Sequence, residues 1–142
     1  MGLLRRTRRR ARRARGLGEA IRAHNRAMVA FDLALGSGAL LAPERTLRVL
    51  GHAQPSEDAV ALFRRCGPIW LTFAAAHALA ATRDRPRDWW ALAWLRGTEI
   101  ATDVVWSTGP GFRDAPLARA ALAVAGAANL AMALAFAHLA RR

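Results

Sequence analysis

Three ionisable residues stand close together in a stretch that is otherwise largely apolar. Arg96, Glu99 and Asp103 lie within residues 89–108, and their spacings of three and four place them on one face of a helix. Carboxylates can donate or accept a proton, and a neighbouring guanidinium can stabilise the charge that proton transfer creates. The same residues could instead form an internal salt-bridge network that only fixes helix packing. The spacing therefore predicts a polar helix face whose role is either chemical or structural.

Single polar residues also interrupt the other long apolar stretches. These are Asp32, His77 and Asn129. At about 1.5 Å per helical residue, they fall at a depth similar to that of Arg96 and Glu99 if the stretches cross a bilayer side by side. Ionisable groups at such a depth cost roughly 2.5–3.5 kcal/mol each, so they persist mainly where they face the bundle interior and find partners. We therefore expect one buried site to which all four stretches contribute.

The residues of this site allow two kinds of role. As an acid–base centre, Glu99 or Asp103 would give a proton and His77 or Asp32 would receive it. As a binding site, the candidate ligand contacts are Arg96, Asn129, Trp70 and Trp106. Structural alternatives stay open, because Asn129 could simply join helices and His77 could be a hydrogen-bonded core residue. Asp32 has no charged neighbour within a helical turn, so it pairs across helices, with Arg96 or His77, or stays protonated.

Metal and cofactor sites have no matching motif. The sequence has no HExxH, no Glu-x-x-His and no pair of cysteines, and phosphate-binding loops and nucleophile elbows are missing as well. We therefore expect no metal and no cofactor.

Four apolar stretches must position these side chains. They cover residues 27–42, 66–82, 89–108 and 117–140, and each lies near the roughly 20 residues that a membrane-spanning helix needs, although the first two are short. A soluble bundle is the alternative, but its helices need a polar face, and residues 69–81 and 120–137 offer almost none. The sequence thus predicts an all-α fold, a bundle of four transmembrane helices in one membrane domain, residues 27–142.

The connecting segments carry turn and capping signals. Residues 43–65 predict two short extramembrane helices, one starting at Pro43 and ending before Gly51, the other capped by Ser56. Residues 83–88 are charged and contain Pro86, as in a tight turn between antiparallel helices. Gly109, Pro110 and Gly111 predict a turn before the last stretch.

Residues 1–26 form an arginine-rich arm, either disordered or helical. Ten of the 22 basic residues fall between Arg5 and Arg26. Beside a membrane span, attraction to anionic lipid headgroups is a simpler account than nucleic-acid binding. With both termini in the cytoplasm, 15 arginines lie inside and six outside, as the positive-inside rule requires. We expect a bacterial inner (cytoplasmic) membrane, the lipid bilayer as partner, and a homo-oligomer or another membrane protein as further possible partners.

The run LLAPERTLRVLGHAQPSEDAVALFRRCGPIWLTFAAAHALAAT (residues 40–82), followed by GTEIATDVVW, resembles small DoxX-like four-helix bacterial membrane proteins. The similar features are a first helix ended by proline, a short extramembrane helix, and Phe63, Arg64 and Gly67 at the entry to the second helix. The resemblance covers about residues 27–140 and implies a four-helix bundle, with little about activity. The long arginine arm departs from this pattern. A more distant likeness in layout, to membrane isomerases of the emopamil-binding type, matches no residue securely.

Three functions follow from these observations. The leading hypothesis is an accessory membrane protein that binds a lipophilic small molecule in a polar cavity at mid-membrane. The second is an intramembrane acid–base enzyme, an isomerase or cyclase, that uses Glu99, Asp103 and His77. The third is a purely structural membrane subunit.

Overall fold

The computed structural model describes residues 2–109 and 115–142, with side chains described from Arg15 onward, and this part of the chain is helical throughout apart from its turns. The helices are α1 (Gly2–Leu41), α2 (Pro43–Val49), α3 (Glu57–Arg83), α4 (Pro86–Thr108) and α5 (Pro116–Ala140). The predicted all-α bundle is confirmed. Pro110 and Gly111 of the predicted turn lie outside the described residues.

Local chemistry sets most helix ends. Helices α2, α4 and α5 each begin at a proline, whose fixed φ suits the first helical position and whose missing N–H costs nothing there. Ser56 caps α3, because its hydroxyl accepts a hydrogen bond from the Ala59 amide at 3.2 Å. At the other end of α3, Asp84 adopts the left-handed conformation, with φ 48°, and its amide donates to the Ala80 carbonyl.

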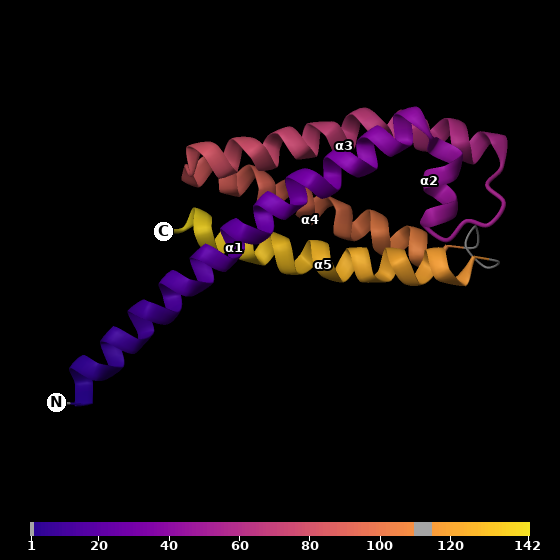
Figure 1. Ribbon diagram of the computed structural model, residues 1–142. Helices are drawn as coiled ribbons and strands as arrows, with labels where there is room; N and C mark the ends of the chain where they lie inside the picture. The colour runs from indigo at the N-terminus through magenta and orange to yellow at the C-terminus, as the bar shows by residue number, and fades with distance from the viewer. Residues whose placement is uncertain (1, 110–114) are drawn as a thin grey trace.

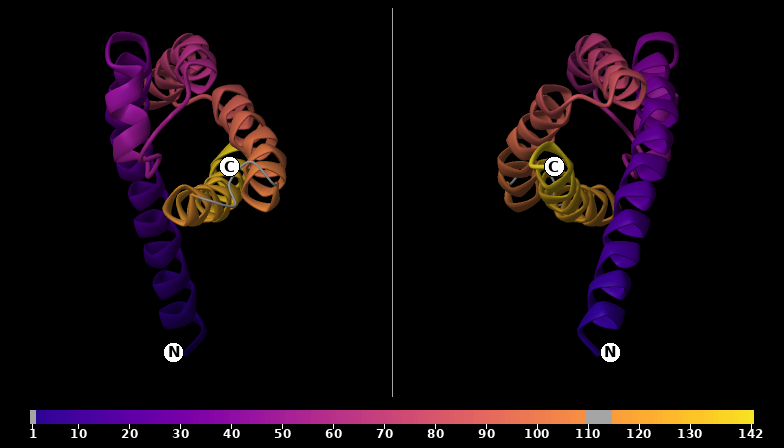
Figure 2. Two further views of the ribbon diagram at one scale, coloured as in Figure 1. Left: turned by 90° about the vertical axis from the view of Figure 1, so that its right-hand side faces the viewer. Right: turned by 90° about the vertical axis from the view of Figure 1, so that its left-hand side faces the viewer.

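The four long helices form two pairs. Helix α1 packs along α3, and α4 packs along α5, while the short α2 lies at the end of the bundle remote from the N- and C-termini of the chain (Figure 1). Viewed end-on, the long helices surround a common axis, and the N-terminal part of α1 projects beyond the bundle (Figure 2). Residues far apart in the sequence, on α1, α3, α4 and α5, can therefore meet at the centre.

Two glycines allow α1 and α3 to approach closely. A Cβ atom on Gly36 would lie 2.9 Å from the carbonyl oxygen of Gly67, and one on Gly67 would lie 2.6 Å from Cγ of Leu40. Such distances leave no room for a side chain without a shift of the backbone. Small residues of this kind let two helices approach closely.

The apolar core fills the end of the bundle where the α3–α4 turn lies. Its buried members come from all four long helices and centre on Trp89, Leu92 and Phe136. The rings of Trp89 and Phe136 pack with centroids 5.7 Å apart. At the same end, Asp84 accepts hydrogen bonds from Arg22 Nε and Nη2 at 3.1 and 2.9 Å and from Trp89 Nε1 at 2.8 Å. The pKa of Asp84 lies below its ordinary value because Arg22 donates to its carboxylate.

The outer surface is unusually apolar while the centre is polar. Large apolar side chains are exposed on every long helix, with Trp94 75% and Leu117 73% accessible. The buried polar or charged residues are Asn25, Asp32, His77, Arg96 and Asn129. One described helix, Pro116–Ala140, is long and apolar enough to cross a membrane by length and composition, and only 22% of its most apolar stretch is buried. A bundle of four membrane-crossing helices stays a prediction.

Two boundaries differ from the sequence prediction. The second short helix expected before residue 65 is not separate, because α3 continues from Glu57 through Pro68 to Arg83. The arm is not set off from the bundle at residue 26 either. Its backbone is helical from Gly2, and Gly18, Ile21 and Asn25 are already buried against other helices.

Candidate functional site

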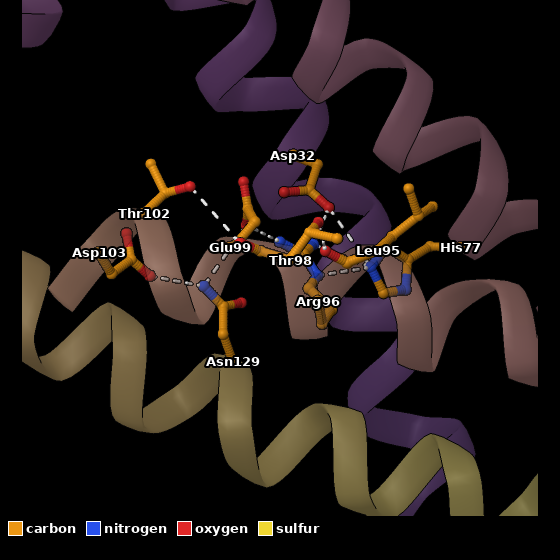
Figure 3. Close-up of polar contacts among 9 residues, drawn as sticks. All are labelled: Asp32, His77, Leu95, Arg96, Thr98, Glu99, Thr102, Asp103 and Asn129. Atoms are coloured by element: carbon orange, nitrogen blue, oxygen red, sulfur yellow. Dashed lines mark hydrogen bonds and ion pairs between the residues drawn. The ribbon is translucent and has the colours of Figure 1, made fainter. Parts of the chain in front are cut away.

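Arg96 is the centre of the polar site. It lies on α4, is 3% exposed, and its guanidinium contacts side chains from three helices (Figure 3). Nη2 forms an ion pair with Asp32 of α1, and Nη1 donates to Glu99 Oε2 at 3.1 Å. Nε and Nη2 face Nε2 of His77 on α3 at 3.2 and 2.8 Å. The carbon of the guanidinium also lies 5.0 Å from the centre of the Phe73 ring, within cation–π range.

The hydrogen bonds around His77 define its protonation. Asn25 on α1 donates from Nδ2 to the carbonyl oxygen of His77 at 2.9 Å, which orients its Oδ1 toward Nδ1 of the ring at 2.6 Å. Nδ1 must then carry a hydrogen, which it donates to Asn25. Two donors of Arg96 lie within hydrogen-bond distance of Nε2, whereas Oδ2 of Asp32 is 3.6 Å away, so Nε2 accepts. His77 is therefore the neutral Nδ1–H tautomer, with both ring nitrogens engaged.

Asn129 joins α5 to the two outer carboxylates of α4. Its Nδ2 donates to Asp103 Oδ2 at 2.9 Å and lies 3.4 Å from Glu99 Oε2. Gly126, one turn earlier on α5, permits this approach, since a Cβ there would lie 3.2 Å from Cβ of Asp103. Glu99 and Asp103 are only partly buried, unlike Asp32, which is fully buried. The site thus has a buried inner part around Arg96 and a more exposed outer part, formed by the carboxylates of Glu99 and Asp103.

Negative groups outnumber positive ones in this site. Three carboxylates, those of Asp32, Glu99 and Asp103, face one guanidinium, and the hydrogen bonds of His77 leave it neutral. Oδ1 of Asp32 is buried and has no hydrogen-bond partner among the described residues. Fully ionised, the site would carry a formal charge of −2. A buried group of this kind is costly unless it takes up a proton or a positive partner.

The structure brings together six of the eight residues predicted for the site. They are Asp32, His77, Arg96, Glu99, Asp103 and Asn129. Asp32 pairs across helices with Arg96, which is one of the two alternatives given for it above. Trp70 instead packs its ring against Phe63, with centroids 5.2 Å apart, and Trp106 is 56% exposed on the outer side of α4. Ligand contact by either tryptophan stays a prediction.

Asn25 is the site residue that the sequence analysis missed, because it stands inside the arginine-rich arm. A signal was present: Ile21, Asn25, Met28 and Asp32 follow spacings of four, three and four, the pattern of one helix face. Phe136 was also not predicted, and its ring packs edge-on against His77 with centroids 5.6 Å apart. Asn25 on α1 and Phe136 on α5 thus contact the imidazole from two different helices.

The chemistry open to the site is narrower than the sequence implied. With both nitrogens of His77 engaged, the groups with spare acceptor capacity are the carboxylates. In the described part of the chain, no three His, Cys, Asp or Glu side chains gather in a way that could hold a metal ion. Comparison with protein-family models, with curated proteins and with solved structures gives no match for this chain. The functional argument therefore rests on the geometry of the site and on the surface around it.

Proposed function

We propose that the chain is a DoxX-like integral protein of the bacterial inner membrane, with both termini in the cytoplasm, that binds a lipophilic small molecule at the polar site between its helices. One observation carries the proposal. Buried polar groups occupy the centre of the bundle while large apolar side chains cover its outside. In water this distribution is unfavourable on both counts, whereas in a bilayer it is what the solvent demands.

The lengths of the helices support this reading. Helices α3, α4 and α5 have 27, 23 and 25 residues, which correspond to about 35–40 Å at 1.5 Å per residue. The hydrocarbon layer is about 30 Å thick, so each could cross it. Between Trp89 and Thr108, helix α4 carries three ionisable residues, but they face partners within the bundle, where the cost of insertion is reduced.

The uneven burial of the site favours ligand binding. In a network that only fixed the packing of helices, we would expect every polar group to be paired and buried. Here the outer carboxylates Glu99 and Asp103 are partly exposed and share the amide of Asn129, and only Glu99 also accepts a hydrogen bond from Arg96. Val104 and Val105 are exposed next to them on α4. A molecule with a small polar group and an apolar body could contact both surfaces.

Acid–base catalysis is the second candidate, and one feature favours it. Glu99 and Asp103 share the amide of Asn129, and two neighbouring carboxylates readily differ in protonation, as an acid and a base must. In this version the two carboxylates carry the proton transfer and His77 positions Arg96. A purely structural subunit would tolerate neither E99Q nor D103N without loss of assembly.

The native cysteine tests the membrane proposal directly. Cys66 is the only cysteine, and in the proposed orientation it lies toward the periplasmic end of α3. Expressed in bacterial cells, the protein should be recovered in the membrane fraction and extracted only by detergent. In intact spheroplasts, an impermeant maleimide should label Cys66 of the unmodified protein. In a C66S background, it should label Q54C in the same way. It should label R85C only after the membrane is permeabilised. Recovery from the soluble fraction in plain buffer would contradict the proposal.

Ligand binding needs a separate measurement. The protein is purified in mild detergent and extracted with organic solvent, and bound molecules are identified by mass spectrometry. A specific ligand should be lost from E99Q and D103N but kept by D58N, an exposed acidic residue at the start of α3 that serves as the matched control. Equal recovery from all variants would contradict a role for the polar site.

A further inference from the structure

The excess of carboxylates identifies the kind of ligand that the site would take. Arg96 is the one positive group that the described residues bring to Asp32, Glu99 and Asp103. Its guanidinium contacts Asp32, His77 and Glu99, whereas Asp103 accepts its hydrogen bond from the uncharged amide of Asn129. In surroundings of low polarity, uncompensated negative charge attracts a cation strongly.

The unused acceptor atoms lie on one side of the network. Asp32 gives one oxygen to Arg96, and its other oxygen, Oδ1, is buried without a partner. Glu99 turns Oε2 toward Arg96 and Asn129. In Figure 3 the remaining oxygens of Asp32 and Glu99 lie on the same side of Arg96. Asp32 Oδ1 is thus a second observation, separate from the partly exposed carboxylates of Glu99 and Asp103. It extends the negatively charged region into the bundle.

Apolar side chains are exposed on the two helices that carry Glu99, Asp103 and Asn129. Along α4, Val104, Val105 and Trp106 are exposed, and Leu130 and Leu134 are exposed on α5. A simple hydrated cation would gain nothing from these side chains. An organic cation with a bulky apolar body would gain from both the carboxylates and the apolar surface.

We propose that the site binds a lipophilic organic cation, with its positive centre at Glu99 and Asp103 and its apolar body toward α4 and α5. This inference rests on the proposed function, since it names the class of the lipophilic ligand. Protons compete for the same carboxylates, because either a proton or the cation removes the excess negative charge.

Three probes of the same shape test the proposal on the unmodified protein. Tetraphenylphosphonium is a cation, tetraphenylborate an anion and tetraphenylsilane neutral. Binding is measured by equilibrium dialysis of the detergent-solubilised protein, with empty micelles subtracted. We expect the cation to bind at least about tenfold more tightly than either other probe, a difference of about 1.4 kcal/mol. Equal binding of all three, or preference for the anion, would overturn the charge selectivity.

Variants then assign the selectivity to the site. E99Q and D103N should each weaken binding of the phosphonium about tenfold or more, while D58N should bind it like the unmodified protein. Circular dichroism and size-exclusion profiles establish that each variant is folded. Unchanged binding by folded E99Q and D103N would refute the assignment.

The outcomes separate this inference from the proposed function. If the neutral probe binds as well as the cation and E99Q weakens both, the site takes lipophilic molecules and only the cation is wrong. If none of the probes binds and no lipophile is extracted with the protein, ligand binding itself fails. Membrane residence is decided independently by the labelling of Cys66.

Discussion

Asp32 of α1 and Arg96 of α4 form an ion pair although 64 residues separate them in the sequence and neither is more than 3% exposed. The pair links the two helix pairs of the bundle at its centre. Breaking a buried pair by removing one partner is costly because the other charge is left uncompensated, whereas an apolar replacement of both can be tolerated.

The first prediction is therefore a non-additive double substitution. R96M should lower the free energy of unfolding by about 3–5 kcal/mol, and D32L combined with R96M should recover part of that loss, because His77 and Glu99 still lack the donors of Arg96. Unfolding in detergent, followed by circular dichroism against denaturant, gives the values. If the two single losses simply add in the double variant, the side chains do not interact.

A second prediction concerns the tautomer of His77. Nitrogen NMR of histidine-labelled protein should show Nδ1 protonated and Nε2 unprotonated for this residue at neutral pH. N25L removes the acceptor at Nδ1 and leaves this buried ring nitrogen without its partner, which costs about 1–3 kcal/mol. A protonated imidazolium in the unmodified protein would contradict the hydrogen-bond assignment.

The third prediction is a small dependence of stability on pH that comes from Asp84. Its folded-state pKa is depressed, so its contribution is present above the unfolded-state pKa of about 3.9 and is lost as the pH falls through the lower folded-state value. Both side chains of the Arg22–Asp84 pair are more than a third exposed, so the effect should be at most about 1 kcal/mol. D84N keeps a residue that tolerates φ 48° and should abolish this part of the acid dependence. An identical acid profile for D84N would exclude the contribution.

A fourth prediction tests the close contact of α1 and α3. G67V should separate these helices, because even a Cβ atom would lie 2.6 Å from Cγ of Leu40. We expect a loss of at least about 1–3 kcal/mol in the free energy of unfolding. G97A, on α4 with nothing within 4 Å of the added Cβ, is the control and should be neutral or slightly stabilising. Equal effects of the two substitutions would show that α1 and α3 do not depend on this contact.

Much of the architecture could be predicted because short-range chemistry encodes it. Pro43, Pro86 and Pro116 start helices wherever they follow a break, and the charged turn after Arg83 leaves α3 and α4 antiparallel. The meeting of Asp32, His77 and Arg96 was predictable from depth along each helix, since polar groups in apolar stretches must find one another.

Other features depend on contacts between helices, which local patterns do not contain. Asn25 was assigned to the arm because its neighbours are arginines, yet α1 packs against the bundle as far back as Gly18, which lies beside Leu139 of α5. The continuation of α3 through Pro68 was missed for a similar reason, because a proline predicts a helix start unless neighbouring helices support the turn that it weakens. Trp70 and Trp106 were chosen by residue type, whereas the angle around each helix decides what a side chain contacts.

The unbroken course of α1 has a mechanical consequence. A helix of 40 residues is about 60 Å long, and Asp32, which anchors it to Arg96, lies near one end of that length. The same rod is also held to the bundle at Arg22 and Asn25. A tilt of about 5° around Arg22 would move the backbone near Gly2 by about 3 Å, so the arginine-rich end moves with whatever shifts the packed part of α1.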